Sequence, residues 1–581
     1  MTLRIRWPWI ILGLLVVLYI AYFAWFTLRA FDLFVYQAHD LGIYDQAVWN
    51  TVHGRPFHST LEKPYDTLLG DHFEPILLLL ALPYALVPSA KTLLFIQSAA
   101  LGLGALPVYW LARAGLASAG AGRRAWEGGQ AGGEQPPVPL AVEGAALVLA
   151  AVYLLYPAVH SANIFEFHPS ALAIPLLLYA ICFLRKRQFA LYFLFLILTM
   201  STKEVLPLTT LGLGFYAFFV ERVRLVGLVT MVASALWFGV AVFVVIPYFG
   251  RQGSSQYFAS YYGWLGEGAF EIVSRLITHP ELLWQRLVRP DSLLYVNRLL
   301  LPVAYVSLLG LPMLLLATPA LLLNVLSDFS FQHQSLNFFQ YAAAIAPFVI
   351  VAAIDGLSFL VHHGRRWLEE IWPGLDRPAM GPILLGMVVG AMLLASLAVQ
   401  RYHGYLPFSS DCYLTPRSDK VAAAAALVQQ IPRQAVVSTD RIFGPHLSQR
   451  AELYLYPSLH DAEYLVVDAS YRDTPFPPRD RYDAIQAILA GGEYGVVDGR
   501  YGFLLLRRGL DQPAIPDRFY DFTRAAQPEP QVKTDLVFGD ELRLTGFDLM
   551  WERPVRPHAP GALLAGLATG RARPAPVLHL D

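Results

Sequence analysis

Ionisable side chains stand at the ends of apolar runs in three short motifs of this chain. The motifs are Gly-Asp-His-Phe-Glu-Pro at 70–75, Phe-Glu-Phe-His-Pro at 165–169 and Ser-Thr-Lys-Glu at 201–204. A charged group at the edge of an apolar helix is costly unless it faces a cavity, a substrate or another charge. Taken singly, each residue is explained as an ordinary polar loop residue. Taken together, they favour one shared site.

Two carboxylates near the start of the chain are candidates for general base catalysis. Asp40 and Asp45 begin an amphipathic stretch in which Leu41, Tyr44 and Val48 share one helical face, and we expect this helix to lie on the outer leaflet. A carboxylate held there could activate a hydroxyl group. The competing interpretation is that Asp40 only caps the helix, whose dipole favours a negative charge at that end. Asp45 lies roughly 140° further round an ideal helix, so the two carboxylates need not form a pair.

Other polar residues of the same loops are candidates for substrate binding, and the cations among them could neutralise a phosphate leaving group. They are Arg55, His72, Glu74, Glu166, His168, Lys203, Glu204 and His333. Carboxylate oxygens would also suit a divalent cation, but no two candidates have diagnostic ligand spacing, so metal dependence stays open. No nucleotide fingerprint or Walker loop occurs in a suitable setting, and we expect no nucleotide cofactor.

Composition places these residues in a membrane protein. Of 581 residues, 56% are hydrophobic and only 15% are charged, whereas about 25% are charged in an ordinary soluble domain. A soluble globular enzyme is therefore excluded. The net charge of −1 gives no field that would hold nucleic acid, and two cysteines exclude a disulfide framework.

Apolar runs long enough to span a bilayer set the expected fold. We expect about 11 transmembrane helices, near 8–28, 92–113, 138–158, 169–184, 188–202, 205–220, 225–247, 298–313, 314–329, 340–360 and 382–400. The segment 75–88 is too short to cross comfortably and is predicted to be interfacial or re-entrant. The two halves of 298–329 are also short, as broken helices would be.

Positively charged residues orient these helices, because Lys and Arg gather in cytoplasmic loops. Arg4 and Arg6 place the N-terminus in the cytoplasm, and eleven crossings then place 402–581 outside. We therefore expect a multi-pass protein of the cell membrane with three regions. They are a membrane domain at 1–401 with an outer loop at 29–75, a small extracytoplasmic α/β domain at 402–510, and a Pro-rich, partly disordered tail at 511–581.

Several motifs resemble a known family. Asp-Leu-Gly-Ile-Tyr-Asp-Gln at 40–46, Gly-Asp-His-Phe-Glu-Pro and Ala-Leu-Pro-Val-Tyr-Trp-Leu-Ala-Arg at 105–113 resemble the prokaryotic integral-membrane family called domain of unknown function two-zero-seven-nine. The resemblance continues through the other motifs and covers roughly residues 30–510.

That family in turn resembles the GT-C superfamily of polytopic glycosyltransferases. In its protein mannosyltransferase and aminoarabinose transferase members, the first outer loop begins with a catalytic acidic residue. An interfacial helix containing proline follows, and then a spanning helix that ends in Tyr-x-Leu-Ala-Arg. The order Asp40, 75–86 and 109–113 reproduces this layout, which implies a catalytic role for Asp40. The second residue of their Asp-Glu pair is Leu41 here, which is a departure from the pattern.

The resemblance implies a membrane-embedded, GT-C-like glycosyltransferase. Such an enzyme moves a sugar from a polyprenyl-phosphate donor to an envelope glycan, lipid or protein acceptor on the outer face. Two alternatives stay open on the sequence: a transporter of a small polar or anionic solute, since charges and broken helices also mark transport pathways, and a non-catalytic envelope scaffold.

Overall fold

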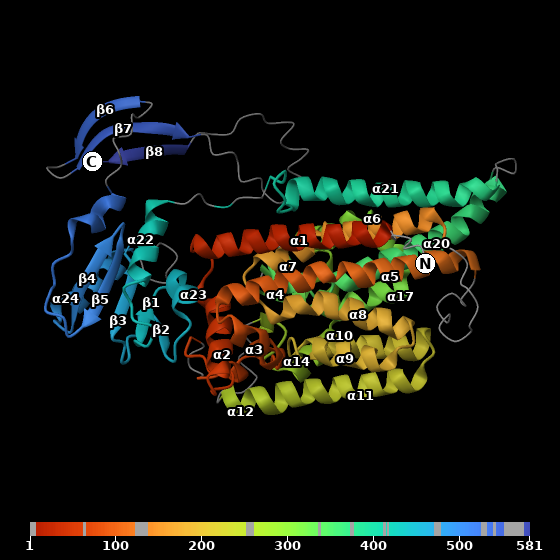
Figure 1. Cartoon of the computed structure of the whole chain (residues 1–581), viewed down its shortest axis with the longest axis horizontal. Coiled ribbons are helices and arrows are strands. Elements are labelled where there is room, and N and C mark those ends of the chain that lie inside the picture. Colours follow the sequence, from red (N-terminus) through yellow and green to blue (C-terminus); the bar gives the residue numbers. More distant parts are fainter. Residues whose placement is uncertain are drawn as a thin grey trace, which may run out of the picture.

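The protein is a bundle of long helices with two small sheets at one end (Figure 1). The computed structural model describes residues 7–61, 66–121, 138–250, 261–329, 331–334, 339–371, 377–410, 414, 418–469, 478–523, 532–538, 542–550 and 575–580. Helix α1 (Trp7–Asp32) begins at the end of the bundle away from the sheets, and α21 (Arg377–His403) ends on the side of the sheets (Figure 1).

Within the described residues, six helices are long and apolar enough to cross a membrane. They are Trp7–Asp32, Ala90–Ala117, Arg224–Gly250, Val306–Leu326, Ala346–Gly364 and Gly381–His403. A bent pair, α6 (Leu140–Leu154) and α7 (Pro157–Ile164), makes a seventh if it is counted as one span. Shorter apolar helices are Ile76–Leu86, Pro169–Arg185, Phe189–Met200 and Leu206–Val220. Many of their large apolar side chains are exposed, as contact with lipid requires.

The region 298–329 departs from the expected pair of short helices. Helix α16 (Pro290–Leu300) is followed by a turn in which Ala304 and Tyr305 adopt positive φ, and a single span then runs over Val306–Leu326. The span packs closely on α20 (Ala346–Ile371): a Cβ on Gly310 would lie only 2.1 Å from the Ala352 carbonyl oxygen. Neither turn residue is glycine, so the sequence carries no signal for the position of the break.

The loop at 29–75 is also more deeply buried than its amphipathic pattern predicts. A π-helical turn, η1 (Ala38–Gly42), leads into α2 (Ile43–Val52), and most residues of α2 are buried. One hydrophobic cluster joins this loop to the C-terminal sheet, with Leu41 and Leu77 in the same core as Leu447 and Val466. The helix therefore lies beneath the C-terminal domain and not on an open leaflet.

The C-terminal domain contains a five-stranded mixed sheet in the order β2-β1-β3-β5-β4. Strands β1 (Val437–Thr439), β2 (Leu453–Leu455) and β3 (Tyr464–Asp468) are parallel, whereas β4 (Tyr494–Arg500) and β5 (Phe503–Arg508) are antiparallel. Helices of this domain include α22 (Asp419–Val428), α23 (Gly444–Leu447) and α24 (Pro478–Ala490). The predicted α/β class is confirmed.

A second, antiparallel sheet is formed by β6 (Val532–Phe538), β7 (Leu542–Met550) and β8 (Ala575–Leu580). Strand β8 belongs to the tail for which composition predicts disorder, yet it pairs with β7 from Leu544 to Met550. The short Val-Leu-His-Leu segment at 577–580 suits a strand, although the surrounding Pro and Ala residues hide it. The rest of that tail, 551–574 and 581, lies outside the described residues.

Candidate active site

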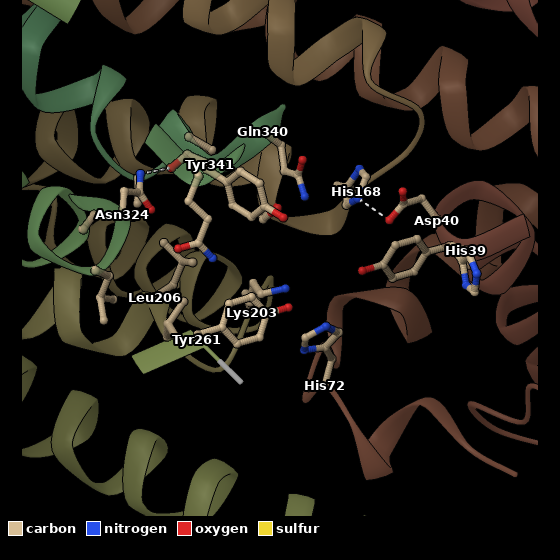
Figure 2. Close-up of a pocket in the computed structure, with 18 of the residues that line it drawn as sticks. His39, Asp40, His72, His168, Lys203, Leu206, Tyr261, Asn324, Gln340 and Tyr341 are labelled. Carbon is tan, nitrogen blue, oxygen red and sulfur yellow. Dashed lines mark hydrogen bonds and ion pairs between the residues drawn. The ribbon is translucent and has the colours of Figure 1, made fainter. Parts of the chain in front are cut away.

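Asp40 lies on η1 and faces a cavity at the end of the helical bundle (Figure 2). Its Oδ1 atom is 2.9 Å from Nε2 of His168, which precedes the short helix η4 (Pro169–Leu172). Burial raises the pKa of Asp40, but the nearby His168, His39 and Lys203 outweigh burial and hold it below its usual range. The carboxylate is therefore ionised at neutral pH and can accept a proton.

The helix that carries Asp40 is capped by a residue from a distant loop. Glu166 has a positive φ of 63°, and its two carboxylate oxygens accept hydrogen bonds from the backbone N–H groups of Gln37 and Leu41, at 2.9 and 2.8 Å. The N-cap position belongs to Gln37 and not to Asp40. The capping interpretation of Asp40 is thus wrong, because Glu166 satisfies the amides and leaves the Asp40 side chain turned to the cavity.

Two cations line the cavity together with Asp40. The Lys203 Nζ atom is 3.8 Å from Oε1 of Glu74. His72 contacts Oε1 of Glu204 through Nδ1 at 3.2 Å and Oδ2 of Asp71 through Nε2 at 3.3 Å. Both carboxylates from Glu74 and Glu204 are nearly or fully buried, so they support the cations from behind and do not face the cavity.

The neighbouring carboxylates raise the pKa of both His72 and Lys203 and so favour their charged forms. Burial lowers the pKa of His72, but Asp71 and Glu204 outweigh it and raise the pKa to about 10. Burial likewise opposes the charged form of Lys203, yet Glu204 and Glu74 raise its pKa. Burial raises the pKa of Glu204, whereas His72 and Lys203 lower it to about 2. The cavity therefore presents two positive charges at neutral pH.

The cavity has a volume of about 220 Å³, far more than one water molecule requires. The ionisable lining groups include Asp40, His72, His168 and Lys203, and Lys203 lies across the cavity from Asp40, beside Tyr261. A set of uncharged polar side chains, called here the uncharged wall, also lines the cavity and consists of Tyr261, Tyr262, Asn324, Gln332, Gln340 and Tyr341. Apolar side chains, among them Leu206 and Leu323, complete the lining. Figure 2 shows Tyr341, Tyr261 and Lys203 on one side of an open space, with His168, Asp40 and His72 on the other.

Three residues predicted for the site lie elsewhere. Asp45 is fully buried and accepts hydrogen bonds from the hydroxyls of Ser448 and Tyr84, both at 2.6 Å. Burial raises its pKa to about 6 although these bonds and Gln449 oppose the shift. It does not line the cavity, and its hydrogen bonds connect α2 with α3 (Ile76–Leu86) and the C-terminal domain.

The other two predicted site residues that do not line the cavity are Arg55 and His333. Arg55 is exposed, and its guanidinium lies 5.7 Å from the centre of the Trp49 ring. His333 is buried, with Nδ1 3.0 Å from the carbonyl oxygen of Asn324. This histidine therefore supports a residue of the uncharged wall and does not itself face the cavity.

Sequence reasoning missed that uncharged wall. Its amides and phenols are ionised at no ordinary pH, so they give no charge signal in the sequence. The available clue is the placement of Gln340 at the start of a largely apolar segment, Tyr-Ala-Ala-Ala-Ile-Ala at 341–346; Gln332 lies in a polar stretch and carries no such clue. No group of three or more His, Cys, Asp or Glu side chains is placed to hold a metal ion among the residues that the structure describes.

Comparison with known proteins gives the family. A family model described as predicted membrane protein (DUF2079) matches residues 29–505, and the chain belongs to this family. It is a multi-pass membrane protein with a small C-terminal sheet domain. No functionally curated protein matches the sequence.

Two solved structures are similar in fold. One is ArnT from Cupriavidus metallidurans bound to undecaprenyl phosphate, with 12% identity, a TM-score of 0.41, and coverage of 86% of this chain and 99% of that chain. The other is the same protein in the apo state, with 12% identity, a TM-score of 0.42, and coverage of 82% and 94%.

Proposed function

We propose that the protein is a membrane-embedded glycosyltransferase that moves a sugar from a polyprenyl-phosphate donor to an envelope acceptor on the outer face. The observation that carries the proposal is the arrangement of charge in one cavity. An ionised carboxylate, Asp40, and two cations, Lys203 and His72, line a space large enough for a small molecule. A glycosyl phosphate needs both kinds of group, on opposite sides of its reacting carbon.

The proposed reaction is a direct displacement. The acceptor hydroxyl oxygen forms a bond to the anomeric carbon while the bond from that carbon to the phosphate oxygen breaks. Asp40 takes the hydroxyl proton, and the phosphate leaves with the bonding electron pair. Lys203 and His72 stabilise the negative charge that grows on the leaving phosphate, and they do so best in a partly dry site.

His168 orients the base in this scheme. Its Nε2 atom contacts Asp40 at 2.9 Å, and its side chain is almost fully buried. Glu166 fixes the backbone on either side of Asp40 through Gln37 and Leu41. The loop at 165–169 therefore sets the position of the carboxylate in two ways, once through the side chain and once through the main chain.

The position of the cavity suits a lipid-borne substrate. The groups around it lie at helix ends, next to helix α3 (Ile76–Leu86), where Leu78, Leu82 and Leu86 are exposed. A polyprenyl chain in the bilayer could reach this boundary with its phosphate at the level of Lys203. We also propose that this end faces outward, because Arg4 and Arg6 precede α1 at the other end.

The test is transfer by the purified full-length chain in lipid nanodiscs, with a radiolabelled polyprenyl-phosphate sugar and membrane extract as the acceptor source. Asp40→Asn keeps the size and polarity of the side chain but removes the base, so turnover should fall by about a hundredfold or more. Asp32→Asn is the matched control, because Asp32 lies at the end of α1 and pairs with Lys91 outside the cavity.

A deletion strain supplies the cellular counterpart. Lipid mass spectrometry should reveal an accumulated polyprenyl-phosphate sugar or an envelope component that lacks a sugar. Normal transfer by a well-folded Asp40→Asn protein would refute the catalytic assignment. Uptake of a solute by proteoliposomes, with no transfer to any acceptor, would favour a transporter.

A further inference from the structure

Two glutamine side chains in the uncharged wall each have a buried amide oxygen without a hydrogen-bond partner among the described residues. Gln332 and Gln340 are 9% and 8% exposed, and both line the cavity. The Oε1 atom of each has no hydrogen-bond partner within the described residues. Figure 2 shows the Gln340 amide directed into the open space between His168 and Tyr341. Buried amide oxygens without partners are unfavourable, and they point to a ligand or water that completes them.

The neighbouring amide of Asn324 has a different role. It donates to the Tyr295 hydroxyl at 2.8 Å and to the Tyr341 carbonyl at 2.9 Å. Asn324 therefore holds the wall together, and it fixes Tyr341 beside the cavity. Among the described residues of this wall, the buried side-chain atoms without a hydrogen-bond partner are the Oε1 atoms of Gln332 and Gln340.

The wall also carries no charge of its own. Asp328 lies four residues before Gln332. It does not line the cavity, and its carboxylate pairs with Arg286 at 2.6 Å. Gln332 and Gln340 are neutral amides, so they offer hydrogen bonds but no counter-ion to a ligand group that contacts them.

We infer that the uncharged wall is a subsite for a neutral sugar, whose hydroxyl groups pair with the amides of Gln332 and Gln340. The inference rests on the proposed function and names its substrate class: the donor carries an uncharged sugar in place of an amino sugar or a uronic acid. An amide both donates and accepts, as does a sugar hydroxyl. The phosphate of the same donor lies toward Lys203 and His72, so the amides and the cations contact different parts of one molecule.

Binding measurements on the full-length chain in nanodiscs test this assignment. The probes are a polyprenyl phosphate without sugar and the same lipid carrying glucose, glucuronic acid or aminoarabinose. Wild-type protein should bind the glucose lipid more tightly than the bare phosphate and more tightly than either charged sugar. Gln332→Leu and Gln340→Leu should each weaken binding of the glucose lipid about 3–10-fold and leave binding of the bare phosphate unchanged.

Gln429→Leu is the matched control, because Gln429 is exposed on the C-terminal domain; it should change neither affinity. Gln340→Glu adds a test of charge: it should weaken glucose-lipid binding and strengthen aminoarabinose-lipid binding. Bare phosphate that binds with no gain from glucose would overturn the neutral-sugar assignment alone. Protein that binds no polyprenyl phosphate would overturn the proposed function together with this assignment.

Discussion

Two clusters of buried charge lie at opposite ends of helix α8 (Ala173–Arg185), and they differ in how they are completed. His168, just before the helix, belongs to the cavity. Arg185, at its other end, donates to both carboxylate oxygens of Asp355 at 2.8 and 2.6 Å and to the Tyr216 hydroxyl at 2.9 Å. Glu221 adds a contact of 3.7 Å.

This difference distinguishes a cluster that stabilises the fold from one that could bind a ligand. The planar guanidinium of Arg185 is matched by a bidentate carboxylate, so this cluster closes on itself. Around the cavity, by contrast, several buried atoms have no partner within the described residues: His168 Nδ1, both glutamine Oε1 atoms and, behind the lining, Glu74 Oε2. A charged residue at a helix end is therefore weak evidence of a functional site when it stands alone. A charged residue next to a cavity and to polar atoms without hydrogen-bond partners is stronger evidence.

Removing a cavity cation should give the largest effect. Lys203→Met in the proposed transferase removes a positive charge from the leaving phosphate and should lower turnover about 100–1,000-fold, the usual loss for one group that stabilises developing charge. Single-turnover transfer measures the loss. Because Glu74 would then be buried without its cation, the double variant Lys203→Met/Glu74→Gln is the control for folding. Recovery of full turnover in that double variant would contradict the role of Lys203.

The Arg185 cluster should respond in the opposite way. Asp355→Asn weakens a charge-assisted pair, and we expect a loss of about 1.5–3 kcal/mol in the free energy of unfolding. Turnover per folded molecule should be unchanged, because the cluster lies a helix length from the cavity. Thermal unfolding in nanodiscs gives the first quantity and the transfer assay the second. Loss of turnover without loss of stability would remove the distinction between the two clusters.

Glu166→Gln tests whether Glu166 acts by positioning the backbone around Asp40. Glutamine keeps one acceptor oxygen but puts an NH₂ group against the Gln37 or Leu41 amide, so the η1 backbone should shift. We expect about a tenfold loss of turnover, with KM for the donor little changed, because Glu166 positions the base and does not touch the donor. A variant in which KM alone changes would show that Glu166 binds substrate directly.

The smallest expected effect concerns Asp45. Its pKa is about 6 in the folded chain and near 3.8 when unperturbed, so between those pH values the folded state holds more protons than the unfolded state. The contribution of Asp45 to the free energy of unfolding is therefore highest below about pH 4, falls as the pH rises to about 6, and is constant above about pH 6. In Asp45→Asn this contribution should vanish. The difference in Tm between variant and wild type, scanned from pH 4 to 7, should change by a few degrees at most.

The sequence predicts the charged half of the site better than the uncharged half. Asp40, His72, His168 and Lys203 could be found because ionisable residues at the ends of apolar helices need a reason to be there. The same signal also selected Glu74, Glu166 and Glu204, which lie behind the lining or under the backbone. Sequence pattern gives the depth of a residue in the membrane, but not the direction of its side chain.

The fold shows the same limit. The membrane class and the α/β domain follow from hydropathy and from strand and helix patterns, and both are confirmed. The turn at Ala304 and Tyr305 and the burial of α2 depend on contacts between distant segments. Glu166 caps a helix that begins well over a hundred residues earlier, and no local motif can reveal such a partner.

The wide spacing of the cavity residues also has a consequence for the making of this protein. The lining extends from His39 to Ala344, so the cavity cannot close until most of the membrane region has been synthesised. At about 5–20 residues per second, Asp40 precedes Tyr341 by roughly 15–60 s. During that time Asp40 and Lys203 have only part of their surroundings, at the edge of the bilayer. Insertion must therefore keep these charges in contact with water or with a helper protein, and a chain arrested before residue 340 would leave them there.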